Sequence, residues 1–270
     1  NYSGININSS LSEVSWGTLA PQLYQEGIPV IKDINETTAS ISVEYQITSQ
    51  NSDGDTELYD VKEFYRMRYL DTRIYLLDFQ RSANQVFDGQ LPVYSDDGII
   101  LGVRDKNVEY MMNDSATVLA FVQEGDLWSY SPGNGKVNQV FSFRKTEDGD
   151  FRDSRIQHDI KIVRVTDAGD IDFVLYGYMN RGSHEGYEGI GVYHYNPDKN
   201  VAEERAFIPV SESFEFLKKD LEKLSYVNEE NELFLLLAKS LYKINIEDNS
   251  SEVLEEGIKN ANFVSSDNND

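Results

Sequence analysis

The feature that most constrains this chain is a short segment that occurs four times in varied form. Each copy opens with an apolar and an aromatic residue, and a second apolar pair follows twelve to fourteen positions later, after turn-forming residues. Two short strands joined by a polar turn give this spacing, so each copy predicts a β-hairpin. The copies lie at residues 73–89, 126–144, 191–209 and 240–257, and they open with Ile74-Tyr75, Leu127-Trp128, Val192-Tyr193 and Leu241-Tyr242.

Other strand patterns come before each hairpin. Residues 39–48 alternate between apolar and polar side chains, which is the period of a strand with one buried face. Residues 159–165 and 171–179 predict two more strands before the third hairpin. Four-stranded units that recur about every fifty to sixty-five residues, with loop insertions, predict a β-propeller. The aromatic residues at the equivalent positions Tyr75, Trp128, Tyr193 and Tyr242 are then expected to pack between units.

We therefore predict an all-β chain with about four complete blades, partial strands and one short helix. Residues 1–33 are interpreted as a lead-in with a closing strand, and residues 34–270 as the propeller domain. The helix is expected near 211–224, because Phe214, Leu217, Leu221 and Leu224 recur at helical spacing. The blades are expected at about 34–90, 91–145, 156–210 and 222–258, and another begins at 259–266.

Composition limits the classes of partner. Lysine and arginine number 24 against 47 aspartate and glutamate residues, which gives a formal net charge of −23. Such a chain repels phosphate backbones and anionic lipids, so we expect no nucleic-acid partner. The absence of cysteine excludes disulfides and thiolate metal sites. No apolar run approaches the roughly 20 residues of a membrane helix, so we expect no transmembrane segment in this chain, and we expect a monomer.

The order of apolar run, polar turn, Leu-Tyr, short polar strand, turn and apolar pair resembles the blades of TolB-type propellers. It also resembles propellers of extracytoplasmic proteins from anaerobic gut Firmicutes. Residues 117–141 and 233–254 carry the resemblance best, although the turn at residues 95–98 lacks the proline of the usual Ser-Pro-Asp-Gly motif. The resemblance implies a bacterial extracytoplasmic propeller, secreted or anchored through a segment absent from this sequence. The start at Asn1, without a leader, agrees with that expectation.

The sequence allows two ways to complete the propeller. Residues 27–33 can pair with residues 259–265 and close a ring. Alternatively, further blades follow Asp270 in a longer protein, which we favour because the sequence stops as a new unit begins.

The segment 179–190, MNRGSHEGYEGI, is the predicted binding loop. It joins the second and third strands of its unit, and its glycines leave Arg181, His184, Glu185 and Tyr187 as a cation, an imidazole, a carboxylate and a stacking ring. Binding residues concentrate on loops of this kind. The alternative is a hairpin tip without a ligand.

Metal sites have little support in the sequence. The three histidines, His158, His184 and His194, have no close ligand spacing, and His194 is expected to be a packed or edge residue. Asn51, Asp53 and Asp55 alternate as at the start of a calcium loop, but Thr56 replaces the expected glycine. Stabilisation of turns by their own Asp and Asn side chains is the simpler explanation. We predict no cofactor and keep calcium as the alternative.

No catalytic motif is present, so the sequence favours a non-catalytic module that binds a protein, peptide or glycan through loops on one face. The alternative is an enzyme, either a carbohydrate-active propeller or the propeller portion of a hydrolase whose catalytic domain is absent. Such a propeller glycosidase needs two or three carboxylates at the channel mouth, for which Asp159 is the first candidate. A structural spacer is the third hypothesis.

Overall fold

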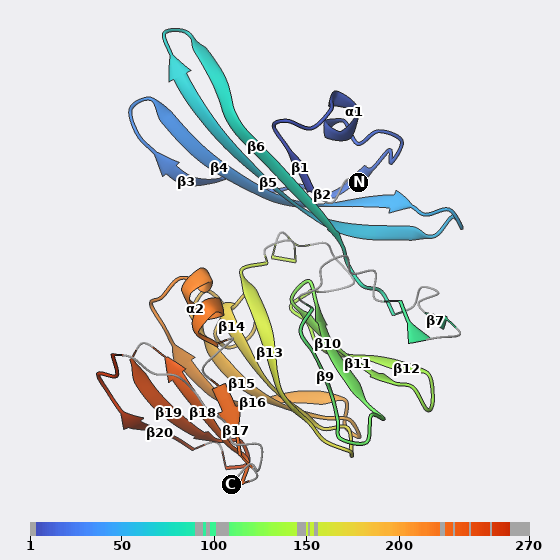
Figure 1. Ribbon diagram of the computed structural model, residues 1–270, viewed down its shortest axis with the longest axis vertical. Helices are drawn as coiled ribbons and strands as arrows, with labels where there is room; N and C mark the ends of the chain where they lie inside the picture. Colours follow the sequence, from blue (N-terminus) through green and yellow to red (C-terminus); the bar gives the residue numbers. More distant parts are fainter. Residues whose placement is uncertain are drawn as a thin grey trace. The chain divides into compact units, whose positions relative to one another are not determined.

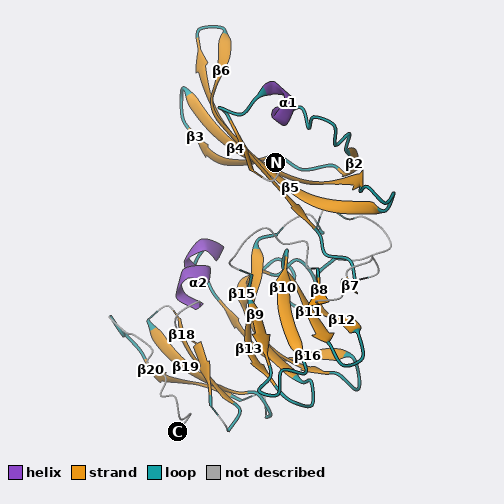
Figure 2. Cartoon of the chain, turned by 45° about the vertical axis from the view of Figure 1, so that its right-hand side comes forward, coloured by secondary structure: helices purple, strands orange, loops and turns teal. Residues whose placement is uncertain are grey.

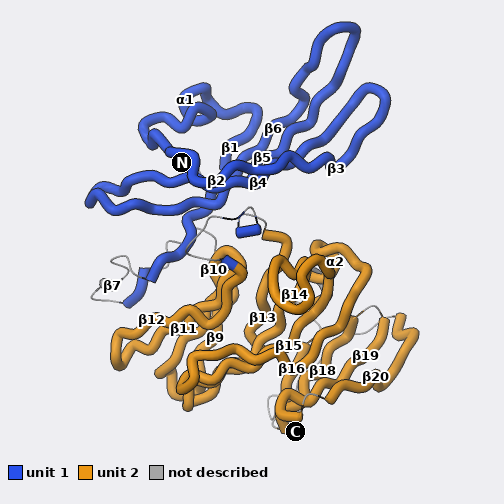
Figure 3. The backbone as a smooth tube through the Cα atoms, turned by 180° about the vertical axis from the view of Figure 1, so that it is seen from behind, with its two compact units in different colours: residues 1–104, 144–155 blue, residues 105–143, 156–270 orange. Residues whose placement is uncertain are grey.

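The structure is a computed structural model that describes residues 4–89, 94–95, 98–100, 108–144, 150, 152–153, 156–221, 225–228, 230–237, 239–248 and 250–259. These residues form antiparallel strands with two short helices, so the all-β prediction is confirmed (Figure 2). The chain divides into two compact units (Figure 3). Unit 1 comprises residues 1–104 and 144–155, and unit 2 comprises residues 105–143 and 156–270.

Unit 1 contains a six-stranded sheet with three long strands (Figure 1). Its order is β1-β6-β5-β4-β2, and β3 also pairs with β4. The strands are β1 (Gly4–Asn6), β2 (Gln22–Gln25), β3 (Val30–Ile34), β4 (Thr38–Gln50), β5 (Thr56–Leu70) and β6 (Arg73–Gln85). A separate two-stranded ribbon consists of β7 (Tyr94–Ser95) and β8 (Gly98–Ile99).

This sheet differs from the four-stranded unit predicted at 34–90. The hairpin predicted at 73–89 is wrong, because β6 runs without a turn from Arg73 to Gln85. The other three copies carry glycine, proline or an Asp-Asn-Ser run in their turns, whereas residues 76–85 contain none of these. Without such a turn the backbone continues as one strand. Tyr75 on this strand is 47% exposed, so it does not pack between neighbouring blades as predicted.

Residues 4–34 also belong to the sheet, whereas the sequence predicts a lead-in. β3 pairs with β4, so it does not serve as the predicted closing strand. The segment predicted to pair with the closing strand, residues 259–265, lies outside the described residues from residue 260 onward.

One face of the unit 1 sheet is apolar and is covered at one end. Ile47, Val61 and Ala83 form a buried cluster there, against which Trp16 packs. Trp16 lies just after the short helix α1 (Leu11–Val14), which begins with a capping box between Ser10 and Glu13. The lead-in is therefore part of the core of unit 1.

Arg81 ties α1 to the sheet. Its guanidinium carbon lies 3.7 Å from the centre of the Trp16 ring, and its two terminal nitrogens donate to the carbonyls of Val14 and Glu13 at 2.9 and 2.8 Å. The same group lies 3.8 Å from the Glu63 carboxylate, which accepts hydrogen bonds from two tyrosine hydroxyls, those of Tyr45 and Tyr65. Burial and then Glu63 raise the pKa of both phenols, so they stay protonated as donors.

Unit 2 contains three consecutive four-stranded sheets, each a meander in which neighbouring strands follow one another along the chain. The first sheet has β9 (Tyr110–Met112), β10 (Leu119–Gln123), β11 (Asp126–Ser131) and β12 (Lys136–Phe141). The second has β13 (His158–Val165), β14 (Ile171–Tyr178), β15 (Glu188–Asn196) and β16 (Val201–Pro209). The third has β17 (Ser225–Val227), β18 (Glu232–Leu237), β19 (Ser240–Asn245) and β20 (Ser251–Glu255).

The three hairpins predicted at 126–144, 191–209 and 240–257 are confirmed, and each contains a β-bulge at its opening pair. The register shifts between Leu127 and Trp128, between Val192 and Tyr193, and between Leu241 and Tyr242. A bulge adds one residue to the partner strand and increases the local twist. The repeated apolar-aromatic pair therefore marks one structural position in all three sheets.

The middle sheet forms the centre of unit 2. Residues of β14 point alternately into two buried clusters: Phe173 packs towards the first sheet and Val174 towards the third. Tyr193 stacks on Phe173 with ring centroids 5.3 Å apart, and its ring centroid also lies 5.4 Å from that of Phe141 in the first sheet. Its predicted packing between neighbouring four-stranded sheets is therefore confirmed.

Helix α2 (Phe214–Leu221) covers the second cluster through Leu217 and Leu221, which confirms the helix predicted near 211–224. Two polar contacts fix the helix to β13. Lys218 Nζ lies 2.7 Å from Asp159 Oδ2, and Lys161 Nζ donates to the Leu221 carbonyl at 2.7 Å. Asp159 is thus paired with the helix. Across the described part of the chain the sheets do not close into a ring, and the β-propeller stays a prediction.

We predict that Arg81→Met lowers the free energy of unfolding of unit 1 by about 3 kcal/mol, because it leaves Glu63 without its cation and two carbonyls without donors. Arg73→Met, at an exposed position of the same strand, is the control and should change stability little. Scanning calorimetry of the full chain measures both. Equal effects of the two substitutions would contradict the role given to Arg81.

Candidate functional site

The first strands of the three sheets in unit 2 line a cleft of about 750 Å³. β9 contributes Met111, Met112 and the following Asp114, β13 contributes residues 161–167 with its turn, and β17 contributes residues 225–228. The lining mixes apolar, aromatic and charged side chains, and the volume lies in the range of pockets that bind small ligands. The sequence does not reveal this cleft, because its three walls come from segments about fifty to sixty residues apart.

One kind of turn joins the first and second strands of all three sheets. It begins with a polar residue, Asn113, Thr166 or Asn228, whose side-chain oxygen accepts hydrogen bonds from backbone amides further along the turn. The fourth residue has a positive φ in each case: 53° at Ala116, 91° at Gly169 and 61° at Asn231. A side chain that mimics a backbone acceptor stabilises such a turn. The turn residues Asn113, Thr166 and Asn228 carry this signal in the sequence.

Asn51 begins a turn of the same form between β4 and β5. Its side-chain oxygen accepts the amides of Asp53 and Asp55 at 3.0 and 2.9 Å, and Gly54 has a φ of 89°. The alternation of Asn and Asp in this segment therefore has a backbone explanation that needs no calcium.

Asn113 and Asp167 link the first two turns at the edge of the cleft. The buried Asn113 amide donates to Asp167 Oδ1 at 2.7 Å, and the Ser115 hydroxyl donates to the same oxygen at 2.8 Å. Hydrogen bonds from the Ser115 side chain and backbone, with a smaller one from Asn113, hold the pKa of Asp167 below its usual value. The carboxylate at this edge is thus ionised and already engaged.

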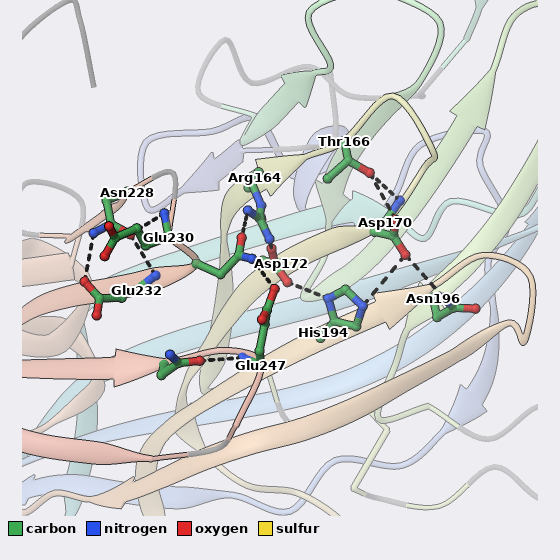
Figure 4. A network of polar contacts seen from close by, with 12 residues as sticks. Arg164, Thr166, Asp170, Asp172, His194, Asn196, Asn228, Glu230, Glu232 and Glu247 are labelled. Carbon is green, nitrogen blue, oxygen red and sulfur yellow. Dashed lines mark hydrogen bonds and ion pairs between the residues drawn. The ribbon is translucent and has the colours of Figure 1, made fainter. Parts of the chain in front are cut away.

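A row of polar side chains crosses the middle sheet (Figure 4). Arg164, Asp172 and His194 lie directly opposite one another on β13, β14 and β15. Arg164 Nε donates to Asp172 Oδ2 at 2.8 Å, and His194 Nδ1 lies 2.7 Å from Asp172 Oδ1. Since Asp172 is only 1% exposed, these two partners compensate the cost of burying its charge.

The row continues into the third sheet. Arg164 also donates to the side-chain oxygen of Asn231, and the Asn231 amide donates to Glu247 (Figure 4). His194 Nε2 faces Asp170 at 3.7 Å. All of these groups are engaged within the fold, so the arrangement fixes the second sheet to the third.

The predicted binding loop at 179–190, whose last residues belong to β15, folds back on itself over residues 179–187. The Met179 amide donates to the Tyr187 carbonyl at 2.9 Å, and the Gly186 amide donates to the Met179 carbonyl at 3.0 Å. These bonds give the loop a defined conformation. It lies at the His158 end of β13, since Gly177 is opposite His158, whereas the cleft lies towards the other end of that strand.

The structure does not gather the four predicted site residues into one pocket. Arg181 Nε donates to the Phe143 carbonyl at 2.6 Å, at the end of the first sheet. His184 stacks on Phe207 with centroids 3.7 Å apart, and its Nε2 lies 2.8 Å from Glu204 Oε1. Both side chains thus hold the loop in place.

Glu185 and Tyr187 of the same loop are exposed, Tyr187 to 62%. Gly189 makes room for the loop, because a Cβ there would lie 2.3 Å from the Phe207 ring. The loop therefore presents one carboxylate and one aromatic ring on a fixed base.

Among the described residues, no group of three His, Asp or Glu side chains is arranged to hold a metal ion. In the same part of the chain, no helix is long and apolar enough to cross a membrane.

Comparisons with known proteins do not identify a family for this chain. No family model matches the chain, and no curated protein matches it. Among solved structures, the extracellular domain of a putative one-component system from B. thetaiotaomicron aligns with 84% of this chain at 10% identity, with a TM-score of 0.18. The chain covers 34% of that protein's length, and a likeness this weak supports no statement about fold or function.

We predict that the Asp167 carboxyl titrates below the value of about 3.9 typical of an unfolded chain. Its contribution to stability is then present above that pH and is lost as the pH falls through the lower folded value. Carbon-13 NMR of the side-chain carboxyl should show the low midpoint, and Ser115→Ala should raise it. Ser183→Ala, in the loop at 179–190, is the control. An equal rise of the Asp167 midpoint in this variant would contradict the role given to Ser115.

Proposed function

We propose that this chain is a non-catalytic binding module and that unit 2 is an arc of β-propeller blades that binds a protein, peptide or glycan. The observation that carries the proposal is the cleft lined by the first strands β9, β13 and β17. In a propeller the first strands of the blades line the central channel, and three consecutive meanders with β13 next to both β9 and β17 fit that arrangement.

The lining of the cleft favours binding. Met112 is 45% exposed, Met111 and Tyr226 are partly buried, and methionine adapts to varied ligand shapes. Tyrosine adds a flat surface with a polar end, which suits both peptides and sugars.

The charged groups near the cleft favour binding over catalysis. Arg164 is paired with Asp172, Lys161 donates to the end of α2, and Asp159, the first candidate for a catalytic carboxylate, is paired with Lys218. A general acid of a glycosidase needs a raised pKa, whereas the pKa of Asp167 is lowered. These contacts support a surface that recognises a ligand without transforming it.

An extracytoplasmic location in a bacterium is part of the same proposal. The resemblance of the hairpin pattern to TolB-type and related propellers supports it. The loop at 179–190 provides a second recognition surface, in which the side chains of Glu185 and Tyr187 are exposed.

A thermal-shift screen with cell-wall saccharides, peptides and calcium identifies the ligand class. A ligand at about a hundred times its dissociation constant should stabilise unit 2 by about 2.7 kcal/mol. Met112→Lys should then weaken binding of the hit at least about tenfold, because it places a bulky charge in the cleft. Tyr110→Lys is the matched control, since Tyr110 is exposed on the same strand and does not line the cleft. Equal affinity of both variants would contradict the role given to the cleft, and an empty screen would exclude the peptide and glycan ligands and leave only a protein partner.

The loop has its own test. The double variant Glu185→Ala/Tyr187→Ala should lower affinity for a protein partner captured by the chain, with little change in melting temperature, because both side chains are exposed. His184→Ala should instead lower the melting temperature, since His184 stacks on Phe207. Isothermal titration calorimetry and thermal melts separate the two effects. Unchanged affinity in the double variant would remove the loop from the binding site.

A further inference from the structure

The two cations in the described lining of the cleft, Lys161 and Arg164, are both engaged within the fold. Lys161 Nζ donates to the Leu221 carbonyl at 2.7 Å, at the end of α2, where a helix carries partial negative charge. Arg164 donates to Asp172 at 2.8 Å and also to Asn231 (Figure 4). The positive charges of the lining are therefore directed at groups of the protein itself.

The two carboxylates of the same lining are not balanced by cations. Asp114 is exposed, and its side chain makes no hydrogen bond or ion pair with another described residue. Asp167 accepts hydrogen bonds at Oδ1 from the neutral side chains of Asn113 and Ser115, and its Oδ2 has no partner in the described part of the chain. Neutral donors hold a carboxylate in its charged form but leave its charge in place. The described lining thus has uncompensated negative charge.

Both carboxylates lie at the same end of the cleft. Asp114 lies two residues after the end of β9, Asp167 lies two residues after the end of β13, and the Asn113–Asp167 hydrogen bond joins the two turns. The larger apolar side chains of the lining come from the strands that lead to the turns, namely Met111, Met112, Val163, Val165 and Tyr226. A ligand with an apolar stem and a positively charged end matches this arrangement.

Other ligand classes match the cleft less well. Calcium takes six to eight oxygen ligands, whereas no group of three His, Asp or Glu side chains among the described residues is arranged to hold a metal ion. An anionic glycan meets two carboxylates and a chain of net charge −23, which repel it. A neutral glycan can donate hydrogen bonds, but it leaves the negative charge of the cleft uncompensated.

We propose that the cleft binds a peptide segment through a lysine or arginine side chain, whose charged end lies at the carboxylates of Asp114 and Asp167. The methylene groups of this side chain pack on Met112 and Tyr226, as the stems of long cationic side chains do on apolar surfaces. This inference rests on the proposed function, in which the cleft is the binding site, and it selects one ligand class from those considered there. The net charge of the chain attracts such a basic partner from a distance.

Peptides that differ in one side chain provide the first test. The probe is a short blocked peptide of alanine and serine with a central lysine, compared with versions that carry glutamine or glutamate at that place. Isothermal titration calorimetry of the full chain should show that the lysine peptide binds at least about tenfold more tightly than the glutamine peptide. The glutamate peptide should bind weakest, and added salt should reduce the difference between the peptides.

Removal of one carboxylate tests the position of the charge. Asp114→Asn should lower the affinity for the lysine peptide at least about fivefold and change that for the glutamine peptide little, because it removes the charge and keeps the size of the side chain. Asp198→Asn is the matched control, since Asp198 is exposed between β15 and β16 and does not line the cleft. Both variants lose the same overall charge, so equal effects on the lysine peptide would overturn the proposal.

Substitutions of opposite charge at Met112 separate recognition of charge from occupation of the cleft. Met112→Lys should weaken binding of the lysine peptide much more than Met112→Glu does, because only the first repels the ligand. Circular dichroism checks that each variant is folded. Equal weakening by both would show a ligand in the cleft whose charge is not recognised, which overturns this inference and leaves the proposed function standing.

The remaining outcomes also separate the two proposals. A lysine peptide that does not bind, or binds no better than the glutamine peptide, overturns the inference, while the screen with other ligands still decides the proposed function. A lysine peptide whose affinity neither Met112 variant changes binds outside the cleft, which contradicts both.

Discussion

The burial of β14 on both faces is the constraint on which unit 2 depends. A strand with apolar side chains on both sides needs an apolar sheet against each, and the first and third sheets supply them. Asp172 lies in the same strand, so its charge has to be compensated inside the interface. Arg164 and His194 do this, and Arg164 carries the contact on to the third sheet.

The cleft follows from this packing. Once the three sheets are stacked, their first strands lie side by side and leave a space between β9, β13 and β17. The turns at Asn113, Thr166 and Asn228 fix the ends of these strands, and the tie between Asn113 and Asp167 joins the first two turns. The cleft is therefore built on rigid elements, which is a condition for selective binding.

In the described part of unit 1, no second large sheet packs on the six-stranded sheet. α1 and Trp16 cover one part of the apolar face, held by Arg81, and the part on the β3–β4 and β5–β6 hairpins remains exposed. Exposure of so much apolar surface is unfavourable in water unless something binds there.

Local signals in the sequence, namely alternation, helical spacing and turn residues, were sufficient to predict the all-β class, three of the hairpins with their opening pairs, and the helix over Phe214 and Leu217. They gave a wrong prediction at residues 73–89, where an apolar-aromatic pair was present without a turn. The cleft, the row from Arg164 to His194 and the exposed apolar face of the β3–β4 and β5–β6 hairpins became visible only in the folded chain. Each of them depends on which strands lie opposite one another, and a linear pattern does not record contacts between residues far apart in the chain.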